Sequence, residues 1–252
     1  MATDKAFLKE LGICVIIPTY NNAGTIEQVI HSVSEYCDDI LVVCDGPTDG
    51  TEELVRQCAT PVHVIAYQPN KGKGTALVTG FREALKLGFR YAITLDSDGQ
   101  HYASDIPAFV DAITEHPDAL IIGSRGLKHD NMPQKNTFAN KFSNFWFTVQ
   151  TGKKLPDTQT GFRLYPLHKM GNMRIITSRY EAELELLVRS AWRNIKIVPI
   201  PINVYYPPQE ERVSFFRPGK DFTRISILNT FFCFAAILYG YPSMLIRKLL
   251  SK

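Results

Sequence analysis

The feature that most limits the fold of this chain is a series of short apolar runs that each end in a polar turn. The runs cover residues 13–18, 40–44, 62–66 and 91–95, and segments with apolar residues at helical spacing separate them. Continuous apolar runs of this length are typical of parallel strands that are covered on both faces. Strands and helices in alternation predict right-handed crossovers and an α/β fold, with a mostly parallel sheet flanked by helices.

Polar side chains follow the ends of these predicted strands. Tyr20, Asp45, Lys71, Asp96 and Asp98 each come shortly after an apolar run. Ligands of parallel α/β sheets bind outside the carboxyl ends of the strands. We therefore expect these five positions to gather at one rim of the sheet, where they would form a binding site.

Residues 93–101 bring two carboxylates, one residue apart, from an apolar strand into a turn that contains Gly99. Because alternate side chains of a strand share a face, Asp96 and Asp98 can converge while Ser97 points away. Hard oxygen ligands of this kind suit Mg²⁺ or Mn²⁺, which share their coordination shell with water and substrate phosphates. A lone pair of this spacing is usually a solvated turn, so the predicted metal site depends on the motifs around it.

The overall composition excludes several classes of protein. The 252 residues suffice for one large domain, predicted over residues 1–216, followed by an apolar helical segment over residues 217–252. The net charge of +3 is small and the basic residues are dispersed, so no nucleic-acid partner is expected. The five cysteines form no C-x-x-C pair and no secretory signal is visible, which favours the reducing cytoplasm.

The C-terminal segment has no charged residue between positions 225 and 246, and basic residues flank it on both sides. Its length would cross a bilayer. An in-plane or re-entrant membrane helix, a full span, and a soluble helix buried on the domain all fit the pattern. Residues 240–243, which include Gly240 and Pro242, are expected to break the helix. We expect a protein that is peripheral or integral at the cytoplasmic face of a membrane.

Six short motifs in fixed order carry a family resemblance. They are IIPTYN (16–21), VCDGPTDGT (43–51), NKGKG (70–74), DSDGQH (96–101), GSR (123–125) and DTQTGFR (157–163). In this order they resemble the family 2 glycosyltransferases of the GT-A fold, and within them the dolichyl- and polyprenyl-phosphate sugar transferases. The resemblance extends over residues 13–214 and implies a Rossmann-like GT-A domain, a nucleotide-sugar donor and a lipid acceptor at a membrane surface.

The resemblance also implies roles for individual residues. The donor nucleotide would be bound by Pro18, Thr19, Tyr20, Asn21, Asp45, Lys71 and Ser97. The metal, Mg²⁺ or Mn²⁺, would be held by Asp96, Asp98 and Gln100. The catalytic residues would be Asp98, Asp157, Arg125 and Arg163. Cys44 departs from the pattern, because many relatives carry an acidic residue at that position.

The chemistry depends on the acceptor. A lipid phosphate is already an anion at neutral pH, so it needs positioning by Arg125, Arg163 or a lysine and no general base. A hydroxyl acceptor would need a carboxylate base, for which Asp157 is the first candidate and Glu181 or Glu183 the next.

We predict a metal-dependent inverting glycosyltransferase that uses a UDP- or GDP-sugar and a polyprenyl phosphate or another membrane lipid. One alternative is transfer to a sugar or lipid hydroxyl in the synthesis of cell-envelope glycolipids or polysaccharides. Another is a catalytically inactive scaffold at a membrane surface. No G-x-G-x-x-G follows the first strand, which argues against a dinucleotide-binding dehydrogenase.

Overall fold

The structure, a computed structural model, describes residues 4–125, 134–171, 173–206 and 218–250, and the side chains of 134–138, 218 and 221 are not described. The predicted domain boundary at residues 216–217 lies outside the described residues. In chain order the elements are α1 (Lys5–Leu11), β1 (Ile13–Thr19), α2 (Ile26–Ser34), β2 (Ile40–Asp45), α3 (Thr51–Gln57), β3 (His63–Tyr67), α4 (Lys73–Lys86), β4 (Tyr91–Thr94), η1 (Ala103–Asp105), α5 (Ile106–Glu115), β5 (Leu120–Arg125), α6 (Gln134–Thr151), β6 (Arg163–Pro166), α7 (Leu167–Met170), α8 (Glu181–Trp192), β7 (Ile197–Ile202), α9 (Pro218–Ala235), η3 (Ala236–Gly240) and α10 (Tyr241–Leu250).

The strands form one sheet of seven in the order β3-β2-β1-β4-β6-β5-β7. All neighbouring pairs are parallel except those of β6, which runs antiparallel to both β4 and β5. The predicted α/β fold with a mostly parallel sheet is therefore confirmed, and the central antiparallel strand is a feature that the sequence did not indicate. β7 contains Pro199 and Pro201 and lies at an edge of the sheet, where the missing N–H of a proline is tolerated.

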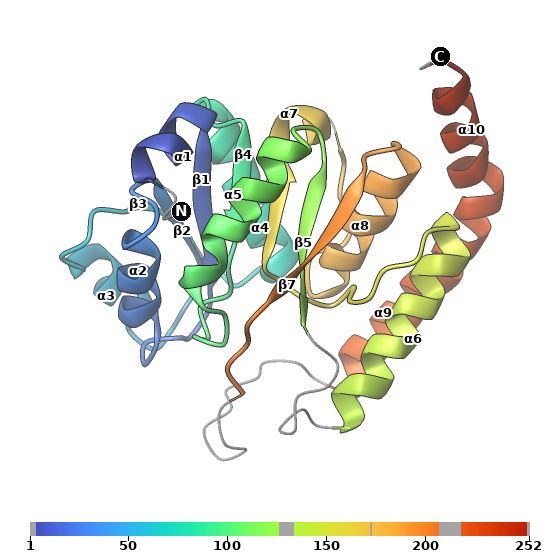
Figure 1. The fold of residues 1–252 in the computed structure, drawn as a ribbon. Helices are drawn as coiled ribbons and strands as arrows, with labels where there is room; N and C mark the ends of the chain where they lie inside the picture. The colour runs from blue at the N-terminus through green and yellow to red at the C-terminus, as the bar shows by residue number, and fades with distance from the viewer. Residues whose placement is uncertain (1–3, 126–133, 172, 207–217, 251–252) are drawn as a thin grey trace.

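Helices cover both faces of this sheet (Figure 1). Alternate residues of β1 divide between two apolar cores, with Val15 and Ile17 on one face and Cys14 and Ile16 on the other. The first core includes residues of α2 and α5, and the second includes residues of α4, α8 and α9. All five cysteines are free. This two-sided burial explains why the strands read as continuous apolar runs.

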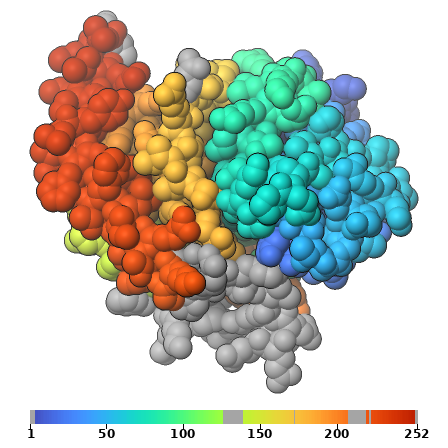
Figure 2. Space-filling model, turned by 180° about the vertical axis from the view of Figure 1, so that it is seen from behind, coloured from blue at the N-terminus to red at the C-terminus, as the bar shows by residue number. Residues whose placement is uncertain are grey.

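The C-terminal segment is a single continuous helix, made of α9, the π-helical turn η3 and α10. It runs along α6 and α8 and forms one outer edge of the molecule (Figure 1, Figure 2). The predicted break at residues 240–243 is wrong. The wide π turn precedes Pro242, which has no N–H to donate. Gly240 lies so close to Trp192 that a Cβ there would be 2.4 Å from the indole Nε1.

Candidate active site

One pocket lies at the carboxyl ends of β1, β2 and β4, next to the start of α4. Its lining residues are Pro18, Thr19, Tyr20, Asn22, Asp45, Asn70, Gly72, Lys73, Ala76, Asp96, Ser97, Asp98, Arg179 and Tyr180. Strand ends from across the sheet thus converge as parallel topology requires. Four of the five rim positions expected from the sequence line this pocket, and Lys71 does not.

Asp45 holds the turn that leads into α4. Its carboxylate accepts hydrogen bonds from the backbone N–H of Lys71 at 2.8 Å and of Gly72 at 2.7 Å, and from the Asn70 side chain at 3.0 Å. Gly72 has φ +100°, and a Cβ there would be 2.5 Å from the carbonyl oxygen of Ser178. Both Asp45 oxygens are therefore engaged in shaping the pocket wall, and a contact with the nucleotide base stays a prediction.

The lysine that reaches into the pocket is Lys73, which the sequence interpretation missed. Lys71 instead places its ammonium 4.9 Å from the centre of the Tyr67 ring. The Lys73 ammonium lies 2.7 Å from Asp96 Oδ1 and 3.2 Å from Glu183 Oε2. The positive φ of Gly72 redirects the chain between the two lysines, and only its position before a helix could have suggested this from sequence.

The two adjacent asparagines, Asn21 and Asn22, also differ in whether they face the pocket. Asn21 accepts a hydrogen bond from the backbone N–H of Thr48 at 2.8 Å, outside the pocket. Asn22 lines the pocket and accepts a bond from the Ser97 hydroxyl at 2.9 Å. Thr25 precedes α2 without a side-chain cap, and its hydroxyl donates to the Ser97 carbonyl at 2.6 Å. These contacts fix the turn that carries the two aspartates.

The two aspartates of this turn have opposite electrostatic environments. Although burial opposes it, the Lys73 ammonium holds the pKa of Asp96 below its usual range. Burial and the neighbouring Asp96 raise the pKa of Asp98 to about 6. Within the turn, the backbone N–H of Gln100 donates to Asp98 Oδ1 at 3.0 Å. The site holds more negative charge than Lys73 alone balances.

This excess of negative charge fits a divalent cation. The carboxylates of Asp96 and Asp98 and the amide of Gln100 supply hard oxygen atoms, which Mg²⁺ and Mn²⁺ prefer. Among the residues that the structure describes, no three His, Cys, Asp or Glu side chains are grouped to hold a metal. His101 is neutral beside this site, because burial lowers its pKa to about 4.

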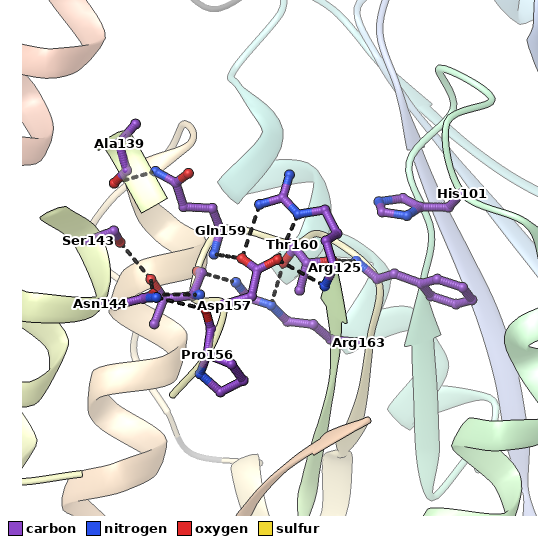
Figure 3. A network of polar contacts seen from close by, with 12 residues as sticks. His101, Arg125, Ala139, Ser143, Asn144, Pro156, Asp157, Gln159, Thr160 and Arg163 are labelled. Atoms are coloured by element: carbon purple, nitrogen blue, oxygen red, sulfur yellow. Dashed lines mark hydrogen bonds and ion pairs between the residues drawn. The ribbon is translucent and has the colours of Figure 1, made fainter. Parts of the chain in front are cut away.

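A second polar cluster lies beside this turn and centres on Asp157 (Figure 3). Asp157 is fully buried, and the Arg125 guanidinium binds it through two bonds, of 2.7 Å from Nε and 3.0 Å from Nη2. The backbone N–H of Gln159 adds a third bond at 2.9 Å. Although burial opposes it, the Arg125 hydrogen bonds hold the pKa of Asp157 below its usual range. A carboxylate so engaged is a weak base.

Arg163 does not reach the pocket. It is fully buried and donates to three carbonyl oxygens, those of Thr160 and Glu183 at 2.7 Å and that of Thr158 at 3.0 Å. Arg163 is the first residue of the antiparallel β6, and its side chain is hydrogen-bonded to the loop of residues 157–162. The predicted contact between Arg163 and a substrate phosphate conflicts with this burial, and the residue instead fixes the loop.

The same loop touches the turn that carries Asp96 and Asp98 through Gly161. The Thr94 hydroxyl donates to the Gly161 carbonyl at 2.7 Å, and a Cβ at Gly161 would lie 2.5 Å from Asp96 Oδ2. Only glycine fits this close approach. The loop that carries Asp157 therefore contacts the turn that carries Asp98 at the Asp96 carboxylate.

The two residues just before α8, Arg179 and Tyr180, complete the pocket, and sequence reasoning did not select them. The glutamates that follow, Glu181, Glu183 and Glu185, are all buried, in contrast to the solvated face that is usual for glutamates on a helix. Ala182 and Leu184 between them are buried as well, so α8 has no exposed face here, and the spacing of apolar residues could not predict the burial of the glutamates.

Comparisons with known proteins agree with this geometry. The profile of Glycosyl transferase family 2 matches residues 14–169. The chain is 32% identical to "Glycosyltransferase AglJ" of Haloferax volcanii over 83% of this chain and 68% of that protein. It is 28% identical to "UDP-N-acetylglucosamine--dolichyl-phosphate N-acetylglucosaminyltransferase" of Methanococcus voltae over 77% of this chain and 86% of that protein.

A solved structure shows the same fold at lower identity. Glucosyl-3-phosphoglycerate synthase of Mycobacterium tuberculosis, in complex with Mn²⁺, uridine diphosphate and phosphoglyceric acid, aligns with a TM-score of 0.66 and 18% identity. The alignment covers 92% of this chain and 80% of that one. With the family match over most of the sheet and the pocket, the chain belongs to glycosyl transferase family 2 and is a glycosyltransferase with a GT-A-like fold.

Proposed function

We propose that this enzyme transfers a sugar from a UDP- or GDP-sugar to the phosphate of a polyprenyl phosphate, in a metal-dependent reaction that inverts the anomeric centre. The observation that carries the proposal is the Arg125–Asp157 pair. Asp157, the leading candidate for a general base, is fully buried, and both of its carboxylate oxygens accept hydrogen bonds from Arg125. Its pKa is held below the usual range. An acceptor that is ionised before it binds needs no such base.

The donor half of the site would bind the nucleotide diphosphate along the pocket. Tyr20 and Thr19 line its floor, and the buried Thr19 hydroxyl has no partner among the described residues, so it is available to a nucleotide. Asp96, Asp98 and Gln100 would hold Mg²⁺ or Mn²⁺, which offsets the charge that develops on the departing diphosphate. Lys73 keeps the Asp96 carboxylate ionised and oriented.

The acceptor half follows from the position of Arg125. Asp157 holds the Arg125 guanidinium in a fixed plane, and 16% of the Arg125 side chain stays exposed. A phosphate anion near it would be positioned by charge and hydrogen bonding. In a single displacement, a phosphate oxygen attacks the anomeric carbon as the bond to the nucleoside diphosphate breaks. The name of the relative from Methanococcus voltae includes dolichyl phosphate, which supports this class of acceptor.

We also propose that the enzyme works at the cytoplasmic face of a membrane. One helix, Phe222–Leu250, is long and apolar enough to cross a bilayer by length and composition. Its apolar surface would bring the enzyme to its lipid substrate. The free state of all five cysteines is consistent with a reducing compartment.

The test is an assay of the purified enzyme with UDP- and GDP-sugars and two matched acceptors, a polyprenyl phosphate and the corresponding polyprenol. We expect transfer to the phosphate only, activity that disappears with a chelator and returns with Mn²⁺ or Mg²⁺, and a product of inverted configuration. Transfer to the polyprenol or to a sugar hydroxyl would contradict the proposal. Glu183, whose pKa is raised by burial, would then be the base to examine.

Arg125→Lys sharpens the same test. A lysine keeps the positive charge but loses the planar fork that binds two oxygens at once. We expect the KM for the polyprenyl phosphate to rise while the KM for the donor stays unchanged. An equal rise in both KM values would show that Arg125 does not act on the acceptor.

A further inference from the structure

The C-terminal helix is apolar on two opposite faces. Its inward face carries Leu228, Phe232, Ala236 and Gly240, all buried against the domain. The helix also exposes many large apolar side chains, and six of them, with exposed fractions between 52% and 82%, form a stripe on the outward face: Ile227, Phe231, Phe234, Leu238, Leu245 and Leu249. Spacings of three, four and seven residues keep this outward stripe on one side of the helix.

Polar contacts fasten the inward face along most of its length. Near the start, the Gln150 amide donates to Asn229 Oδ1 at 2.9 Å. Further along, the Tyr241 hydroxyl donates to the Val149 carbonyl at 2.6 Å, and the Asn194 amide donates to the Met244 carbonyl at 2.9 Å. The helix is thus part of the catalytic domain over residues 229–244.

These contacts conflict with a helix that spans a bilayer. A spanning helix would leave the domain and meet lipid around its circumference. The buried amides of Gln150 and Asn229 would then lose their partners or enter hydrocarbon, at a cost in free energy. The indole of Trp192, which donates to the Gln150 carbonyl at 2.9 Å, would lose the Gly240 surface on which it packs.

The outward stripe is too extensive for an ordinary surface in water. From Ile227 to Leu249 it extends over about 33 Å of helix, and Figure 2 shows this helix as the outer edge of the molecule. Monomeric soluble proteins rarely expose a contiguous apolar patch of such size. We therefore expect another apolar surface to cover the stripe.

Charge at the two ends of the helix identifies that occupant as a lipid surface. Lys220 and Arg224 lie at the first end and Arg247 and Lys248 at the second. Arg193 adds to the second cluster, where partial burial and the nearby Arg247 lower its pKa. Basic groups at both ends of an apolar stripe suit a helix that lies flat among anionic headgroups.

We propose that the helix of α9, η3 and α10 lies flat in the interface of one membrane leaflet, with its inward face docked on the domain and its outward stripe among the acyl chains. This inference rests on the proposed use of a membrane lipid as acceptor. Arg224 binds Glu181 Oε1 at 3.1 Å, and Glu181 follows Tyr180 of the donor pocket. The first end of the helix therefore places the pocket beside the membrane surface.

The first test compares two exposed leucines. Leu238→Asp places a charge on the outward stripe, and Leu87→Asp places the same charge on a leucine at the end of α4, which is 49% exposed. Cosedimentation uses vesicles of phosphatidylcholine and phosphatidylglycerol. We expect Leu238→Asp to reduce vesicle binding more than about tenfold and Leu87→Asp to leave it unchanged, with equal thermal unfolding. An equal effect of both changes, or none from Leu238→Asp, would overturn the proposal.

The second test distinguishes a flat helix from a span. In a Cys58→Ser, Cys233→Ser background, a single cysteine is introduced by Lys220→Cys or by Lys248→Cys. Membranes from expressing cells are treated with an impermeant maleimide before and after detergent. We expect equal reactivity at both positions, because both ends lie on one side. Protection of only one end would show a span and overturn the inference.

The same variants separate this inference from the proposed function and from self-association. If Leu238→Asp converted a dimer to a monomer in light scattering while vesicle binding persisted, a second copy would cover the stripe and the inference would be wrong. If labelling showed a flat helix but no polyprenyl phosphate were glycosylated, only the proposed acceptor would fail. If the lipid were glycosylated but the ends were labelled differently, only the flat helix would fail.

Discussion

The turn that carries Asp98 and the loop that carries Asp157 both border the Asp96 carboxylate, yet they treat their own carboxylates in opposite ways. At Asp98, burial and a second carboxylate raise the pKa to about 6. At Asp157, a bidentate arginine and two backbone N–H groups hold the pKa low. Around Asp98 two neighbouring carboxylates face the single ammonium of Lys73, whereas the charge of Asp157 is neutralised by Arg125.

This difference separates a binding group from a supporting group. A carboxylate with unbalanced charge at the edge of a pocket gains from a cation, whereas a carboxylate whose oxygens are all engaged has little to offer a substrate. The two residues look alike in sequence, since each is an aspartate within a short polar motif. Substitutions at each region should therefore affect different properties of the enzyme.

The largest expected effect is that of Asp98→Asn on turnover. Loss of one of the two carboxylates proposed to bind the metal should reduce kcat by roughly 10³-fold. Stability should not fall at pH 8. The folded pKa of about 6 lies above the unfolded value, so ionised Asp98 lowers the stability of the wild type at high pH. Metal-free wild type should gain stability as the pH falls from about 7 towards 4, and the variant should lack this gain in thermal unfolding.

Gly161→Ala should produce the next largest effect. The new Cβ would lie 2.5 Å from Asp96 Oδ2, so the carboxylate must move. A displacement of about 1 Å can cost on the order of 10²-fold in rate. Gly24→Ala is the matched control, because nothing lies within 4 Å of the added atom. Equal turnover in the two variants, measured at saturating donor, would mean that the Gly161 contact does not position Asp96.

Asp157→Asn should change stability more than turnover. Removing one charge of a buried pair leaves the Arg125 charge uncompensated, at about 3 kcal/mol in unfolding free energy. The folded pKa of Asp157 is depressed, so its contribution is present above the unfolded pKa and is lost as the pH falls. Denaturant unfolding at several pH values should show this loss in the wild type only. A drop in turnover beyond about 10²-fold, with donor affinity intact, would instead identify Asp157 as a general base.

The smallest effect is expected for Lys71→Ala. Its ammonium lies over the Tyr67 ring and away from the pocket, so donor affinity should change by no more than about twofold. Lys73→Ala provides the comparison, since Lys73 contacts Asp96 directly. If titration with a UDP-sugar gave the same loss of affinity for both variants, Lys71 would share the role that the geometry gives to Lys73.

The sequence predicted the fold class and the location of the candidate pocket, because both follow from strand ends and the order of motifs. It could not predict which of two neighbours faces the pocket. The positive φ angle of Gly72 determines that Lys73 and not Lys71 faces the pocket. A hydrogen bond from the Ser97 hydroxyl holds Asn22, and not Asn21, at the pocket. Nor could it reveal the burial of Arg163, which depends on an antiparallel strand of four residues.

That short strand also constrains how the molecule can assemble. β6 is sixth in the chain but lies between β4 and β5, so the sheet has no continuous centre until residues 163–166 have been synthesised. A nascent chain that ends before this point carries Asp96 and Asp98 just after β4, whose outer edge is then open and invites pairing with other chains. The sheet beside the turn of residues 96–101 is therefore completed only by a strand that follows this turn by a long stretch of chain.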